Sequence, residues 1–188
     1  MNKIFRSLAL VGALASLAPV ASATVLTFDD LADGYLPTNY GGLNWALEGW
    51  TAFSTEQSPF TAHSGAGRIA TQWGGDDVAA TIGLIKPTVF QGAYFAGLTG
   101  AEVSFKLYLG GNLVASSSLL NPTATPTFLS SGYKGLVDTV VVSSRDHAGF
   151  VMDDFTFTAA VPEPESYALM LAGLGLMGAV ARRRATKA

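Results

Sequence analysis

The sequence of 188 residues contains no cysteine and only two histidines. The absence of cysteine excludes disulfide bonds, thiol chemistry and zinc sites with cysteine ligands. Neither His63 nor His147 belongs to a motif with metal-ligand spacing, and the stretch HSGAG that begins at His63 lacks the Gly-x-Ser-x-Gly pattern of a nucleophile elbow. We therefore expect no catalytic residues and a protein that is not an enzyme.

Basic residues are scarce between the two ends of the chain. Residues 24–160 contain five Lys or Arg and twelve Asp or Glu, which gives this segment a net charge of −7. An acidic segment repels phosphate backbones, so nucleic acid is excluded as a partner. Divalent cations and neutral glycans are compatible with this charge.

The N-terminal end has the pattern of a secretory signal peptide. Lys3 and Arg6 precede the uncharged run SLALVGALASLAPV, and Ala21 and Ala23 occupy both small positions of an Ala-x-Ala site. We expect residues 1–23 to be removed by cleavage after Ala23. The alternative is a retained N-terminal membrane anchor, which the short apolar run disfavours.

A second apolar run lies at residues 167–181. As a helix, these 15 residues would extend over roughly 22 Å, less than the ~30 Å hydrocarbon core of a bilayer. We expect a short hydrophobic transmembrane segment here, followed by a basic cytoplasmic tail at residues 182–188, because Arg182, Arg183 and Arg184 keep their end of a segment in the cytoplasm. A buried helix of a soluble core is the alternative, but three glycines and an entirely apolar surface disfavour it.

A short linker at residues 160–166 precedes this run and contains Pro162, Glu163 and Pro164. The Pro-Glu-Pro, the short hydrophobic run and the arginine cluster resemble, in order and spacing, the PEP-CTERM sorting signal of Gram-negative bacteria. The resemblance implies that an exosortase, a membrane cysteine transpeptidase, recognises Pro162, Glu163 and Pro164. It also implies a transient stay of the precursor in the inner membrane, followed by transfer to the cell surface or extracellular matrix.

Residues 24–159 are predicted to form an all-β ectodomain. The clearest strand is residues 101–109, where Val103, Phe105 and Leu107 alternate with polar side chains, and Gly110-Gly111-Asn112 turns the chain into a second strand. Further strands are expected at 24–28, 43–46, 68–73, 78–84, 93–96, 136–142 and 150–158. Many short strands with Gly- and Pro-rich turns favour a two-sheet antiparallel sandwich of jelly-roll type, with a closed barrel as the alternative. The stretches LTFDDL, YGGLNW and GFVMDDFTF resemble small β-rich domains that often precede this tail.

Two aspartate pairs are candidate calcium ligands. Asp29 and Asp30 end the first expected strand, and Asp153 and Asp154 lie in the last; first and last strands are often neighbours in jelly rolls. Calcium takes six to eight oxygen ligands, which clustered carboxylates and backbone carbonyls supply. Alternation with Phe155 and Phe157 places Asp153 on the inner side, where a carboxylate needs a partner. The alternative is that both pairs are solvated turn and edge residues.

Exposed aromatic rings are candidate glycan contacts, above all Trp73 beside two glycines, and Tyr40; for Trp45 and Trp50 we favour burial in the core. The sequence thus predicts an exported protein with a structural or adhesive role at the cell surface or in an exopolysaccharide or biofilm matrix. One alternative is a calcium-stabilised carbohydrate-binding module that binds extracellular polysaccharide. Another is a polysaccharide-active hydrolase that uses paired carboxylates.

Overall fold

The computed structural model describes residues 22–47, 49–71, 78–145, 148–159 and 169–178. The described residues from Ser22 to Ala159 form one compact unit, whereas residues 169–178, a short helix with exposed side chains, belong to a separate unit. The fold of the first unit is what positions the candidate site.

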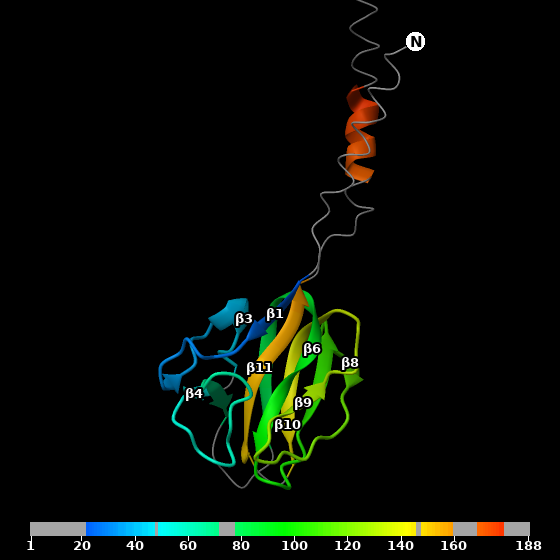
Figure 1. Cartoon of the computed structure of the whole chain (residues 1–188). Coiled ribbons are helices and arrows are strands. Elements are labelled where there is room, and N and C mark those ends of the chain that lie inside the picture. The colour runs from blue at the N-terminus through cyan, green and yellow to red at the C-terminus, as the bar shows by residue number, and fades with distance from the viewer. Residues whose placement is uncertain (1–21, 48, 72–77, 146–147, 160–168, 179–188) are drawn as a thin grey trace, which may run out of the picture. The chain divides into compact units, whose positions relative to one another are not determined.

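The first unit consists of antiparallel β-strands (Figure 1). The strands are β1 (Ala23–Leu26), β2 (Gly34–Tyr35), β3 (Leu43–Asn44), β4 (Thr51–Phe53), β5 (Arg68–Ala70), β6 (Val78–Gly97), β7 (Ser104–Leu109), β8 (Asn112–Ser116), β9 (Thr127–Ser130), β10 (Val137–Ser144) and β11 (Phe150–Ala159). Within the described residues of this unit, the single helical element is a 3-10 turn at Tyr40–Gly42. The all-β prediction is confirmed.

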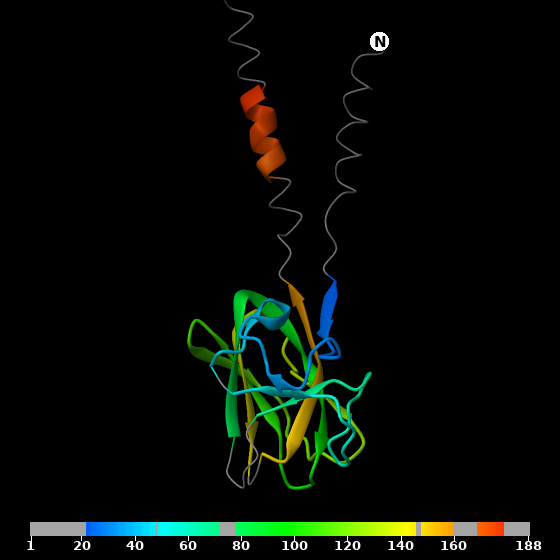
Figure 2. The same cartoon turned by 90° about the vertical axis from the view of Figure 1, so that its left-hand side faces the viewer.

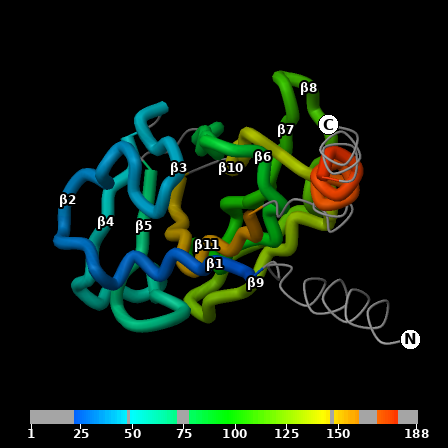
Figure 3. Tube along the Cα trace, turned by 90° about the horizontal axis from the view of Figure 1, so that it is seen from above, coloured from blue at the N-terminus to red at the C-terminus, as the bar shows by residue number. Residues whose placement is uncertain are grey.

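The strands are hydrogen-bonded in the order β2-β4-β5-β11-β6-β10-β7-β8. In addition, β1 pairs with β11, while β3 and β9 both pair with β6. Viewed from above, β2 to β5 gather on one side of the unit and β7 and β8 on the other, with β6, β10 and β11 between them (Figure 3). The two-residue β2 and the five-residue β8 are therefore the ends of this series.

The predicted hairpin is confirmed in detail. Leu109 and Asn112 are cross-strand partners, and Gly110 and Gly111 both have positive φ angles, 57° and 78°. Such angles match the twist of a two-residue hairpin turn and suit glycine. Phe105 and Leu107 are fully buried, as the alternation predicts.

Two expected strands, at 78–84 and 93–96, are parts of one strand, the 20-residue β6. Its first half pairs with β10 and its second half with β11 and β9. Pro87 does not break the strand, because it lies in the exposed stretch around a register shift, where no ladder hydrogen bond is required of its missing N–H. Three strands were not predicted, β2, β4 and β9, and all are short, with two to four residues.

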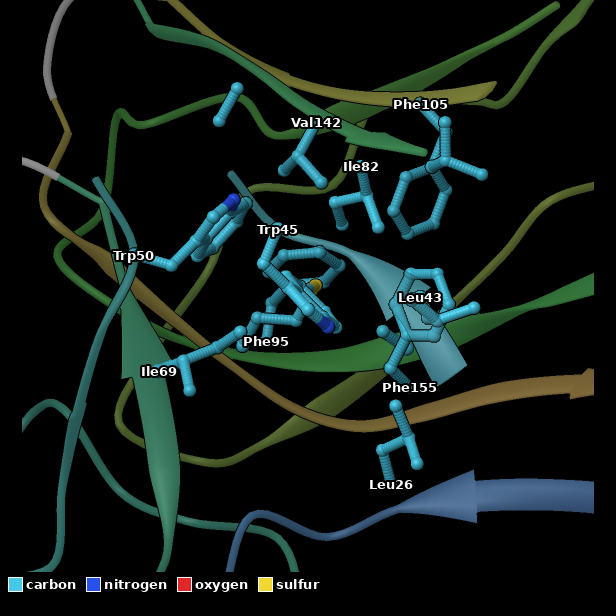
Figure 4. Packing of buried hydrophobic residues seen from close by; sticks show 14 of the residues in the cluster. Leu26, Leu43, Trp45, Trp50, Ile69, Ile82, Phe95, Phe105, Val142 and Phe155 are labelled. Atoms are coloured by element: carbon cyan, nitrogen blue, oxygen red, sulfur yellow. The ribbon is translucent and has the colours of Figure 1, made fainter. Parts of the chain in front are cut away.

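An aromatic cluster fills the interior (Figure 4). Trp45 lies at its centre, with ring centroids 5.8 Å from Trp50 and 5.9 Å from Phe155 in edge-to-face contacts. Both tryptophans are only 1% exposed, so the expectation that they pack in the core is confirmed. The Nε1–H of Trp45 donates to the carbonyl of Tyr40 (2.8 Å), which satisfies the polar end of the ring.

The two ends of this unit are neighbours. In the register of β1 and β11, Ala23 lies opposite Thr158 and Leu26 opposite Phe155. Figure 2 shows the start of β1 beside the end of β11. The expected adjacency of the first and last strands is therefore present, and it places both aspartate pairs on neighbouring segments.

Candidate functional site

The expected orientation of Asp153 is wrong. Asp153 is opposite Tyr94 on β6, and Tyr94 is opposite Phe128 on β9, whereas the inward-facing Met152 is opposite Phe95. Directly opposed residues share a face of a sheet, so Asp153 projects from the outer face. The alternation fails because β11 has an irregularity after Asp153, where Asp154 adopts a positive φ of 48°.

The Asp153 carboxylate is nevertheless buried, because the loop of residues 54–67 crosses the outer face above it. The backbone N–H groups of His63 and Ser64 donate to its Oδ2 (2.8 and 2.9 Å), and the N–H of Asp154 donates to its Oδ1 (2.6 Å). Burial raises the pKa of Asp153 to about 6, against the opposing effect of these amide donors and with a further increase from the charge of Asp154.

Asp154 binds the same loop through side chains. Its Oδ2 lies 2.6 Å from Nδ1 of His63, and its Oδ1 accepts a hydrogen bond from Oγ of Ser64 (2.7 Å). The positive φ of Asp154 re-aims its side chain, so that two consecutive carboxylates reach one segment of loop. Ser64 and His63 thus both contact Asp154, which is a bracing arrangement and not a serine nucleophile next to its base.

Asp29 braces the end of this loop. Its Oδ1 accepts hydrogen bonds from the N–H groups of Ala66 (2.8 Å) and Gly67 (2.7 Å), and the Gly67 contact holds the pKa of Asp29 below its usual value. The chain approaches so closely that a Cβ on Gly67 would lie 2.4 Å from the backbone carbonyl of Phe28. Asp30 acts elsewhere, because its Oδ1 accepts the phenol hydrogen of Tyr40 (2.6 Å).

The buried Arg68 completes the attachment of the loop. Its guanidinium donates to the carbonyls of Phe53, Thr55, Phe60 and Ala66 and lies 4.3 Å from the centroid of the Phe53 ring. Four carbonyls and one aromatic face therefore compensate a cation that is 1% exposed. Beneath the loop, Phe60 joins a second apolar cluster with Ala70, Ala96 and Val151.

A row of rings begins at His63 in the loop, with His63 and Phe128 exposed and Tyr94 half-buried between them. The imidazole of His63 stacks on Tyr94 with centroids 3.3 Å apart, and the Tyr94 ring lies 5.1 Å from that of Phe128. Sequence reasoning did not identify this row, since its members come from a loop, β6 and β9. The signal that was available is weak: each residue is a single aromatic or imidazole ring in a short polar segment.

The predicted site residues have different outcomes. Three of the four aspartates converge on loop 54–67, and the fourth, Asp30, binds Tyr40. Tyr40 is half-buried, and its ring centroid lies 5.6 Å from that of Phe28. Burial and the neighbouring Asp30 raise its pKa. Trp73, the other glycan candidate, lies outside the described residues.

The carboxylate oxygens of the candidate calcium ligands are largely occupied by hydrogen bonds. Most of the contacted oxygens of Asp29, Asp153 and Asp154 accept hydrogen bonds from N–H or O–H donors of the loop. A calcium site instead needs oxygens whose lone pairs face the ion. Among the residues that the structure describes, no group of three or more His, Asp or Glu side chains is arranged to hold a metal ion. Calcium binding by Asp29, Asp30, Asp153 and Asp154 stays a prediction.

The sorting motif, the arginines and one of the two signal-cleavage residues lie outside the described part of the chain, whereas the other cleavage residue, Ala23, begins β1. The residues outside it are Ala21, Pro162, Glu163 and Pro164, and Arg182, Arg183 and Arg184. Of the expected transmembrane segment, residues 169–178 are described and form the exposed helix. No helix within the described ranges is long and apolar enough to cross a membrane.

Comparison with known proteins identifies the C-terminal segment. The family model described as the PEP-CTERM protein-sorting motif matches residues 160–184, so the chain carries this motif after a β-rich body. None of the curated proteins compared matches the chain significantly. A similar solved structure is TmCBM61 in complex with beta-1,4-galactotriose, at 14% identity and a TM-score of 0.45 over 69% of this chain and 100% of that one.

Proposed function

We propose that the protein is exported and sorted by an exosortase to the cell surface or the exopolysaccharide matrix, where residues 24–159 have a structural or adhesive role. The observation that carries the proposal is the match of the sorting-motif family to residues 160–184. The Pro-Glu-Pro is the recognised element, the apolar run holds the precursor in the inner membrane, and the arginines set its orientation.

The geometry of the first unit favours this non-catalytic role. The two carboxylates that a hydrolase would need, Asp153 and Asp154, are both engaged in bracing one loop. The polysaccharide-active hydrolase therefore has no supporting observation among the described residues. Adhesion is favoured by a surface that keeps one shape. Three carboxylates and one guanidinium hold loop 54–67 on the outer face, which supports an adhesive role.

A jelly-roll sandwich is the finer description of the fold that we propose. It is supported by β6, whose two halves have different partners, and by the core. Ile82, Phe105 and Val142 from β6, β7 and β10 pack on one side of Trp45, while Phe95, Phe155 and Ile69 pack on the other (Figure 4). In a sandwich of this kind, β6 would contribute one half to each sheet.

The sorting proposal is tested by fractionating cells with and without the exosortase and measuring the mass of the mature protein. We expect the wild-type C-terminus to lie upstream of Ala188 when the exosortase is present. Replacing Pro162, Glu163 and Pro164 by alanine should keep the precursor in the membrane fraction. Glu165→Ala is the matched control, because it removes a neighbouring carboxylate outside the Pro-Glu-Pro. A mature protein that still ends at Ala188 would contradict the proposal.

Calcium is a separate proposal that needs its own measurement. If the four aspartates bind it, calorimetry on residues 22–160 will show heat on addition of Ca²⁺, and EDTA will lower the melting temperature. Asp30→Asn is the informative variant, because Asp30 makes no hydrogen bond to loop 54–67 among the contacts described above. No heat and an unchanged melting temperature would end this proposal.

A further inference from the structure

A shallow open hollow of about 380 Å³ lies beside loop 54–67. It is lined by Thr51, Phe53, Thr55, Gln57 and Phe60. Thr51 and Phe53 flank Ala52, which packs into the main core, so both project from the outer face of β4. The loop residues Thr55, Gln57 and Phe60 supply the remaining walls. The volume is at the lower end of the range for small-molecule sites, ~300–1,000 Å³.

The lining residues that the structure describes are uncharged and of two kinds. The aromatic part is the half-buried Phe53, which packs against the second apolar cluster, and the small exposed part of Phe60, a member of that cluster that is 8% exposed. Two threonine hydroxyls and the Gln57 amide offer both donors and acceptors of hydrogen bonds. An anionic ligand is disfavoured here, because residues 24–160 have a net charge of −7 and the described lining residues include no cation to attract it. A neutral molecule with an apolar face and a rim of hydroxyls matches both kinds of lining.

The walls are held in place by one buried group. The guanidinium of Arg68 donates to the carbonyls of Phe53, Thr55 and Phe60, three of the five lining residues. It also lies against the Phe53 ring, 4.3 Å from its centroid. A hollow whose walls are fixed before binding loses little conformational entropy when a ligand is bound. The contacts that attach loop 54–67 to the strands therefore also fix the residues around the hollow in one arrangement.

We propose that this hollow binds a neutral hexopyranose unit of a polysaccharide. The C–H face of the sugar would pack chiefly against Phe53 and touch only the exposed edge of Phe60, and its hydroxyls would exchange hydrogen bonds with Thr51, Thr55 and Gln57. Because the hollow is open, the unit can belong to the interior of a longer chain. The inference deepens the adhesive role and rests on the proposed surface location, although the binding itself is independent of sorting.

The test is affinity electrophoresis of residues 22–160, which hold the whole hydrophobic core, in gels containing galactan, mannan, β-glucan or xylan. Alginate and polygalacturonate serve as anionic probes. We expect at least one neutral polysaccharide to retard the wild type, and the anionic ones to leave it unretarded. Gln57→Ala and Thr51→Val should each weaken the binding about fivefold to tenfold, as the loss of one hydrogen bond implies.

Thr81→Val is the matched control, since Thr81 is also a half-buried threonine in a strand, on β6 and outside the hollow. It should bind as the wild type does. The proposal is overturned if no neutral polysaccharide retards the wild type, if only the anionic ones do, or if Gln57→Ala and Thr51→Val bind normally. Failure of the sorting proposal would appear instead in the mass of the mature C-terminus, so the two are distinguishable.

Discussion

Replacing Arg68 by methionine tests whether the guanidinium holds loop 54–67. Methionine keeps an apolar stem of similar length but removes the donors to four carbonyls. Hydrogen bonds to charged groups contribute about 1.5–3 kcal/mol each. The carbonyls of Thr55 and Ala66 belong to exposed residues, where water can replace the guanidinium, whereas Phe60 is buried. Counting only the two more shielded carbonyls, those of Phe60 and the half-buried Phe53, we expect a loss of about 3–6 kcal/mol in the free energy of unfolding.

The assay is urea unfolding of residues 22–160, followed by tryptophan fluorescence, because Trp45 and Trp50 are buried in the core. Limited proteolysis within residues 54–67 reports separately whether the loop detaches. Arg145→Met is the control: its guanidinium is 63% exposed and contacts Glu102 at 3.1 Å, so we expect a change below about 1 kcal/mol. If Arg68→Met costs no more than Arg145→Met and the loop resists protease equally, the loop is held by other contacts and our reasoning fails.

Three further changes test the bracing and the sheet. Because the pKa of Asp153 is raised to about 6, its contribution to the free energy of unfolding should fall as pH rises from about 4 to about 6. In Asp153→Asn, the urea midpoint should no longer fall over this pH range. The pKa of Asp29 is lowered, so the stability that Asp29 contributes should be lost as pH falls below the ordinary carboxyl pKa of 3.8. Asp29→Asn should abolish this loss. If the pH midpoint of acid unfolding is the same in the variant, the bond to Gly67 does not stabilise the fold. Gly92→Ala should destabilise by about 3 kcal/mol or more, because φ is +148° and a Cβ would lie 2.2 Å from the Leu129 carbonyl oxygen, whereas Gly49→Ala should be nearly neutral in thermal melts.

Regular alternation made the strands around Phe105 and Phe157 predictable, because burial on one face leaves a period of two in the sequence. The irregularity at Asp154 left no such trace, and it reversed the face of Asp153. Strands of two or three residues, such as β2 and β4, are too short to show a period. They exist because neighbouring strands supply their hydrogen-bond partners, which is tertiary information.

The candidate site was predictable only in part. The adjacency of the first and last strands followed from the expected topology, and Asp29, Asp153 and Asp154 all contact loop 54–67. The role of these carboxylates did not follow, because it depends on loop 54–67, whose N–H groups occupy their oxygens. A loop without hydrophobic period gives no indication of the face that it will cover. The buried Arg68 was likewise read only as a strand residue.

The pairing of β11 has a mechanical consequence for a domain attached through its C-terminal side. Tension applied at that end enters the unit at Ala159, the last residue of a ten-residue strand. Near this point β11 is flanked by β1 on one edge and β6 on the other, with Thr158 paired to both Ala23 and Val89. Pulling along the strand loads these bonds in shear, so that many must break together. The segment that meets the load first is therefore among the most firmly held in the unit.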